Sequence, residues 1–175
     1  MGSIYVGPYL SHAIEYAFAL DDGCGEGVGY TLGVLDTTEF LRTSEGYRNS
    51  LAAKYPYRAV CDGCIVDSNP GGLLLHEQEL VNKEMHSTVD LTQPHKYHNT
   101  YPSHLHIDIK KRYQGKGYGV VLINRQLGAL RAGGSKGVHL IQAADNGRAL
   151  HFYTTKFGFE IIDRLPGELV LGLKL

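Results

Sequence analysis

The 175-residue chain has no tryptophan, only three cysteines and no long apolar stretch. No run approaches the roughly 18 apolar residues of a membrane-spanning helix, and the first residues lack the basic segment and apolar core of a signal peptide. Cys24, Cys61 and Cys64 are too few for a secreted disulfide scaffold. A formal net charge of −1 excludes the overall basic character of a protein held mainly by nucleic-acid phosphates. We therefore expect a soluble cytoplasmic protein with neither a membrane nor a nucleic-acid partner.

Glycine, by contrast, is abundant. It accounts for 22 of the 175 residues, about twice its usual share. The glycines have neither the period of three of collagen nor the apolar-poor setting of low-complexity disorder. The length suits one ordinary hydrophobic core, and no internal repeat or linker divides the chain. We therefore expect a single domain over residues 1–175.

Hydrophobic periodicity and turn residues predict an α/β fold. The expected strands cover residues 15–21, 28–35, 104–109, 138–144, 159–165 and 169–175. The expected helices cover residues 36–54, 73–86, 120–132 and 146–157, and residues 87–102 are expected to form a loop.

The most informative segment lies between the expected strand 104–109 and the following helix, where Gly115, Gly117 and Gly119 alternate with other residues. The first N–H groups of a helix lack intrahelical partners and carry partial positive charge, and glycine lets the backbone approach an anion closely. Basic residues add charge of the right sign: Lys110, Lys111, Arg112 and Lys116. The segment is therefore either a pyrophosphate cradle or simply the start of a helix beside a solvated basic face. Its spacing matches neither a P-loop nor a dinucleotide fingerprint.

Two motifs carry a family resemblance. Gln-Gly-Lys-Gly-Tyr-Gly at 114–119 resembles the Gln/Arg-x-x-Gly-x-Gly/Ala motif of the GNAT superfamily of acyl-CoA-dependent N-acyltransferases. Asn-x-x-Ala-x-x-Phe-Tyr-x-x-Lys-x-Gly-Phe at 146–159 resembles the fourth helix and next strand of that family. More narrowly, segments 101–108 and 137–140 resemble the microbial branch related to the acetyltransferase-like C-terminal domain of O-GlcNAcase. The implied fold is a mixed, largely antiparallel central sheet flanked by helices, with a shortened N-terminal unit.

The resemblance also implies a function and a donor site. The implied reaction moves an acetyl group from acetyl-CoA to an amine by direct attack in a ternary complex. The main chain of Ile107 and Ile109 would pair with the pantetheine arm, and Asn146 would bond to that arm or cap its helix. A bulge in strand 104–109 would separate it from strand 138–144 and hold the thioester. The CoA pyrophosphate would be bound by the backbone amides of Gln114, Gly115, Lys116, Gly117, Tyr118 and Gly119.

Catalysis by this route needs an acid for the leaving thiolate and a base for the amine. Tyr153 matches the family tyrosine that acts as the acid, although it also fits a core aromatic on its helix. His104, His106 and Asp108 lie at i, i+2 and i+4, so one face of their strand carries all three. Three alternatives are open: one of these residues is the base, all three form a buried polar network, or a chain of water molecules removes the proton.

Other expectations concern metals and partners. A single Cys-x-x-Cys pair at 61–64, with scattered histidines such as His95 and His98, falls short of four placed zinc ligands, so we expect no metal. The amine acceptor is not identified by the sequence. A homodimer formed through an exposed strand edge is a further expectation. The alternative function is a catalytically silent module of the same fold, serving protein interaction or acyl-CoA sensing.

Overall fold

A six-stranded sheet forms the centre of the computed structural model, which describes residues 5–58, 60–61, 64–65, 78–79, 82 and 96–175. The strands are arranged in the order β1-β2-β5-β6-β8-β7. Their bounds are β1 Ala17–Asp21, β2 Gly27–Val34, β5 Ser103–Ile109, β6 Gly137–Ala143, β7 Glu160–Leu165 and β8 Glu168–Lys174. A separate two-stranded hairpin consists of β3 Val60–Cys61 and β4 Cys64–Ile65.

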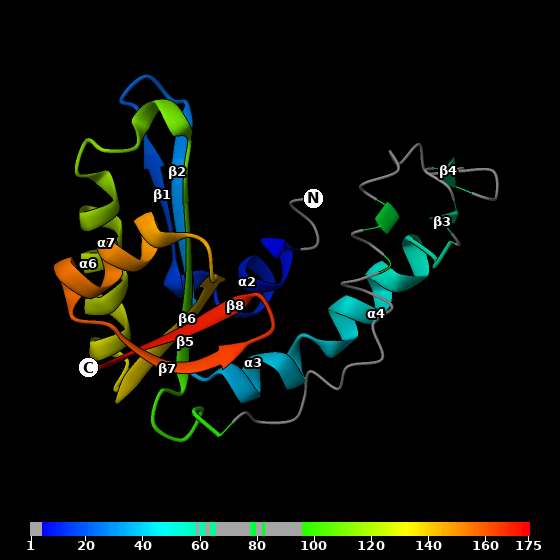
Figure 1. Ribbon diagram of the computed structural model, residues 1–175. Helices are drawn as coiled ribbons and strands as arrows, with labels where there is room; N and C mark the ends of the chain where they lie inside the picture. Colours follow the sequence, from blue (N-terminus) through cyan, green and yellow to red (C-terminus); the bar gives the residue numbers. More distant parts are fainter. Residues whose placement is uncertain (1–4, 59, 62–63, 66–77, 80–81, 83–95) are drawn as a thin grey trace.

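Helices cover both faces of the sheet, with α6 and α7 on one side and α2 on the other, while α3 and α4 lead away from it (Figure 1). The helices are α2 Gly7–His12, α3 Thr37–Thr43, α4 Glu45–Lys54, α6 Tyr118–Ala132 and α7 Gly147–Phe157, with short 3₁₀ turns η1 Ile14–Tyr16 and η2 Lys111–Tyr113. The predicted fold class, a largely antiparallel sheet flanked by helices, is confirmed. None of the described helices is both long and apolar enough to cross a membrane.

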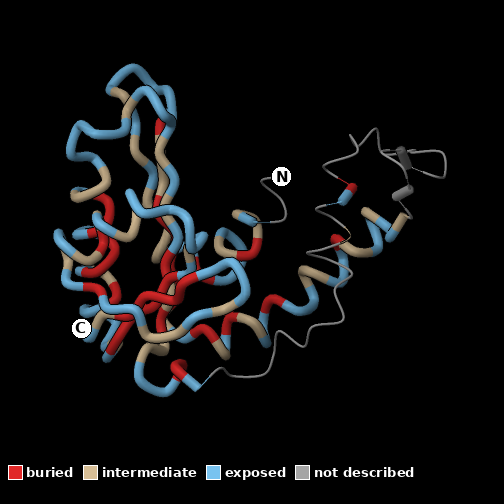
Figure 2. Tube along the Cα trace, viewed as in Figure 1, coloured by how far each residue is buried: buried red, intermediate tan, exposed pale blue. Residues whose placement is uncertain are grey.

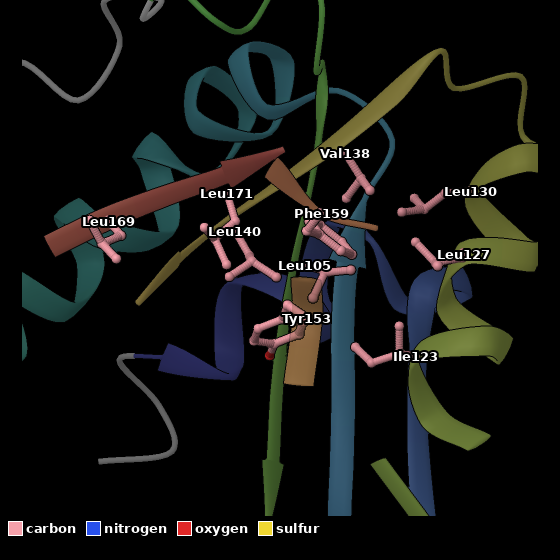
Figure 3. Packing of buried hydrophobic residues seen from close by; sticks show 10 residues of the cluster. All are labelled: Leu105, Ile123, Leu127, Leu130, Val138, Leu140, Tyr153, Phe159, Leu169 and Leu171. Carbon is pink, nitrogen blue, oxygen red and sulfur yellow. The ribbon is translucent and has the colours of Figure 1, made fainter. Parts of the chain in front are cut away.

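The main core lies between the sheet and the pair α6 and α7 (Figure 3). The inward stripe of α6 supplies Ile123, Leu127 and Leu130, spaced so that they share one face of the helix. Leu105 of β5 and Leu171 of β8 meet them from the sheet. The buried segments in Figure 2 follow this interface, and the outer surfaces of the helices are exposed. Burial of this face positions α6 and α7 against β5.

The sheet has one parallel pair, β5 with β6, and that pair is short. Only Ser103 with Val138 and His104 with His139 are in register, whereas β2 and β5 pair from Val34 with His104 to Gly29 with Ile109. The two parallel strands therefore separate beyond His104. The β2–β5 ladder shows no register shift, so the bulge expected in strand 104–109 is not present there. Separation comes instead from the early end of the β5–β6 ladder.

Other differences from the expected elements are local. The helix expected over 36–54 is two helices divided at Ser44, where the hydroxyls of Thr43 and Ser44 bond to carbonyls one turn back, a contact that bends helices. The first strand starts at Ala17 because η1 precedes it. The expected helix 73–86 and the expected loop 87–102 lie largely outside the described residues. Residues 96–100, which are described, form turns.

Candidate functional site

A cavity of about 620 Å³ opens where β5 and β6 separate. Main-chain groups of β5 beyond His104 have no ladder partner on the β6 side among the described residues, so they can bond to a bound molecule. The cavity is bounded by β5, by the loop after it, by the start of α6 and by α7. Its lining comprises Ile107, Asp108, Ile109, Gln114, Gly115, Gly117, Gly119, Val120, Asn146, Arg148, Ala149, Phe152, Tyr153 and Lys156.

Most residues singled out in the sequence meet in this cavity. The lining includes Tyr153 and Asp108 among the catalytic candidates, and seven of the nine candidate donor-binding residues. His104, His106, Lys116 and Tyr118 are not in the lining. Five further residues of the lining have no role predicted from the sequence: Val120, Arg148, Ala149, Phe152 and Lys156. The α7 residues among them could have been found from helical spacing, because positions 148, 149, 152, 153 and 156 fall on one face of the helix.

The loop between β5 and α6 adopts the conformation that its glycines permit. Gly115 and Gly117 have φ values of 75° and 91°, in the left-handed region where a side chain is strained. α6 begins directly after Gly117, with the Val120 N–H bonded to the Gly117 carbonyl at 3.0 Å. A Cβ on Gly119 would lie 3.2 Å from Cζ of Phe152, so this glycine lets α7 pack closely on the helix start. The N–H groups of Tyr118 and Gly119 precede the first bonds of the helix, so they have no intrahelical partner at the edge of the cavity.

Asn146 caps α7, because its Oδ1 accepts a hydrogen bond from the Ala149 N–H at 3.1 Å. Its side-chain NH₂ group is left for other partners, so capping and contact with a bound donor are compatible.

Tyr153 projects from α7 into the core beside the cavity, and its ring packs edge-on against Phe152 and Phe159 at centroid distances of 5.2 and 5.5 Å. The residue is only 8% exposed, and burial raises the pKa of its phenol to about 12. No described residue forms a hydrogen bond with its hydroxyl. The group is thus a protonated donor at neutral pH, beside the cavity and without an acceptor in the described part of the chain.

His106 and Asp108 lie on the opposite face of β5 from Ile107 and Ile109, beside Tyr30 of β2. Tyr30 is in register with Asp108, and the Tyr30 and His106 rings are 6.0 Å apart. Burial lowers the pKa of His106 below its usual value, while the negative charge of Asp108 opposes that shift. Burial and the same carboxylate raise the pKa of Tyr30. His106 is therefore mostly neutral at pH 7 and can accept a proton.

His104 is placed differently, between α2 and α3. Thr37 Oγ1 donates its single proton to the Pro102 carbonyl at 2.7 Å, so it accepts from His104 Nδ1 at 2.9 Å. His104 Nε2 then accepts from the Tyr9 hydroxyl at 2.7 Å. Both ring nitrogens are thus engaged, and burial, with a smaller effect of neighbouring histidines, lowers the pKa of His104 to about 3. This arrangement ties α2 and α3 to β5 and leaves no nitrogen for a substrate.

The described residues contain no group of three or more histidine, cysteine or acidic side chains placed to hold a metal ion. His95 lies outside the described residues, and His98 and His104 belong to a packed aromatic cluster with His139.

Comparison with known proteins shows to which family the chain belongs. Residues 84–159 match the family model described as the acetyltransferase (GNAT) family. A solved structure, the crystal structure of SsHAT, is similar to the chain with 30% sequence identity and a TM-score of 0.75. The alignment covers 99% of this chain and 79% of the SsHAT chain. The chain belongs to the GNAT acetyltransferase family. The matching family model describes acetyltransferases, so the expected family placement is confirmed.

Other relatives of this GNAT protein agree with that placement. Protein O-GlcNAcase from Rattus norvegicus and from Mus musculus is 27% identical over 98% of the chain, which spans only 18% of either relative's length. PH1933 from Pyrococcus horikoshii OT3, 17% identical over 98% of this chain and 72% of its own, shares the fold with a TM-score of 0.56. The predicted resemblance to the O-GlcNAcase-related branch is therefore confirmed.

Proposed function

We propose that this GNAT protein transfers an acetyl group from acetyl-CoA to an amine by direct attack in a ternary complex. The observation that carries the proposal is the cavity bounded by β5, the start of α6 and α7. It brings the edge of β5 that has no ladder partner among the described residues, the start of α6 and the Tyr153 phenol to one site.

The donor would extend along this cavity. Backbone N–H groups of residues 114–119, with the partial positive charge of the α6 start, suit the pyrophosphate. Main-chain groups of Ile107 and Ile109 suit the amides of the pantetheine arm, although the Ile109 carbonyl also accepts a hydrogen bond from Gln114 Nε2 at 2.8 Å. The side-chain NH₂ group of Asn146 is a further donor to that arm. The thioester would then lie near Tyr153, whose hydroxyl has no hydrogen-bond partner among the described residues.

The acceptor amine would approach from the face of β5 that carries His106 and Asp108. Asp108 forms no ion pair with a described residue, so its carboxylate can attract an ammonium group. His106 is the proposed base, since its lowered pKa keeps it neutral. His104 is the weaker candidate because both of its nitrogens are engaged. The bound ammonium group first gives one proton to His106, and the resulting neutral amine attacks the carbonyl carbon, so that the C–N bond forms as the C–S bond breaks. The departing sulfur takes the proton of the Tyr153 hydroxyl, and the phenolate regains a proton that the acylated nitrogen releases through solvent.

The decisive experiment titrates acetyl-CoA into the protein by calorimetry and follows the melting temperature. We expect stoichiometric binding and a rise in melting temperature, because a ligand that binds only the folded state stabilises it. Release of free CoA thiol across a panel of primary amines then tests transfer. Absence of both heat and stabilisation would refute the proposal, and binding without transfer to any amine would favour a silent module. The cytoplasmic location and the homodimer stay predictions.

A further inference from the structure

Two positively charged side chains of α7, Arg148 and Lys156, line the cavity. Both are exposed, and no carboxylate of a described residue lies within ion-pair distance of either. Their charges are therefore available to a bound molecule.

The basic residues of the loop before α6 do not line the cavity. Glu26, in the turn after β1, binds Lys110 Nζ at 2.8 Å and also Arg112. These two contacts lower the pKa of the Glu26 carboxyl. Lys116 Nζ lies 5.2 Å from the centre of the Tyr113 ring. None of these cations, nor Lys111, is in the cavity lining.

The contact between Phe152 and Gly119 shows where Arg148 and Lys156 lie relative to the start of α6. Its Cζ is the nearest atom to a Cβ built on Gly119. Arg148 and Lys156 are four residues before and after Phe152, so each lies about 6 Å along α7 from that contact and on the same face. The two charges flank the point where α7 meets the N-terminus of α6.

We propose that Arg148 and Lys156 bind the phosphate groups of the acyl donor, and that the basic loop residues Lys110, Lys111 and Arg112 do not. This assignment rests on the proposed function, since it assumes a CoA donor. The phosphates would be held from two sides, by backbone N–H groups of the loop and α6 and by full positive charges of α7. A donor that carries phosphates would thus gain affinity that a phosphate-free pantetheine donor does not.

The test measures dissociation constants by calorimetry for acetyl-CoA and for S-acetylpantetheine, which has no phosphate. Arg148→Gln and Lys156→Gln are each expected to raise the Kd of acetyl-CoA about fivefold, and the double variant about 20-fold, as for partly exposed charge pairs. The Kd of S-acetylpantetheine should change less than about twofold. The acetyl-CoA effect should shrink at 0.5 M salt, because exposed charges are screened.

Matched controls separate local from general electrostatics. Arg131→Gln and Lys136→Gln remove the same charges from positions outside the cavity lining, and Lys111→Gln does so within the loop; all three should leave the Kd of acetyl-CoA within about twofold. Equal weakening by Lys111→Gln, or equal weakening for S-acetylpantetheine, would overturn the assignment. So would α7 variants that bind acetyl-CoA as the wild type does. If the wild-type protein binds neither acetyl-CoA nor S-acetylpantetheine, the proposed donor itself is refuted.

Discussion

Replacement of Tyr153 by phenylalanine separates its chemical role from its packing role. The substitution keeps the ring, with its contacts to Phe152 and Phe159, and removes only the hydroxyl. No described residue bonds to that hydroxyl, so its loss leaves no buried group without a partner. We expect the free energy of unfolding to change by about 0.5 kcal/mol or less, which for a chain of this size is a shift of about 1–2 °C in melting temperature.

The effect on turnover should be much larger. A positioned proton donor contributes about 10²-fold or more, so kcat should fall at least about 100-fold, equivalent to about 2.7 kcal/mol of transition-state stabilisation. The Kd of acetyl-CoA should change less than about twofold. Because burial raises the pKa of Tyr153 to about 12, the wild-type enzyme should keep its phenol protonated up to pH 10.

The assay combines steady-state thiol release, calorimetric binding of acetyl-CoA and thermal melting on the same samples. Tyr16→Phe is the matched control, since Tyr16 packs against the core but is not in the cavity lining. It should melt and turn over like the wild type. If Tyr153→Phe retains more than half of the wild-type kcat, the acid role is wrong. If its melting temperature falls by more than about 5 °C while binding collapses, Tyr153 is a packing residue.

Two pH-dependent predictions concern the histidines of β5. Burial places the pKa of His106 below 6.5, and a base acts in its neutral form, so wild-type kcat/KM should rise with pH through a limb below pH 6.5. His106→Gln should abolish that limb and lower kcat about 100-fold; an unchanged limb would assign the base elsewhere. The pKa of His104 is about 3 in the folded protein and about 6.5 in the unfolded chain, so the unfolded chain binds more protons between those values. Its contribution to stability is therefore complete above pH 6.5 and is lost as pH falls toward 3. The free energy of unfolding should drop by about 2 kcal/mol more between pH 7 and pH 5 in the wild type than in His104→Gln, as urea titrations would show; parallel losses would contradict the assignment of a buried neutral ring.

Much of the candidate site could be predicted from the sequence because its determinants are local. Gly115 and Gly117 need left-handed backbone between a strand and a helix, and that requirement is visible in a few consecutive residues. The capping role of Asn146 and the inward stripe containing Tyr153 follow from helical spacing in the same way. Alternation along β5 likewise put His104, His106 and Asp108 on one face.

The tertiary structure decided the features that depend on residues far apart in the chain. His104 and His106 share a face, yet Tyr9 and Thr37 engage only His104, and those partners lie 95 and 67 positions away. Glu26 binds Lys110 and Arg112 across 84 and 86 positions, so two of the four basic side chains of the loop are paired outside the cavity lining. The cavity lies beside β5 beyond the point at which its ladder with β6 ends, after His104. Spacing within one segment specifies local geometry, whereas these pairings depend on how the sheet and its covering helices assemble.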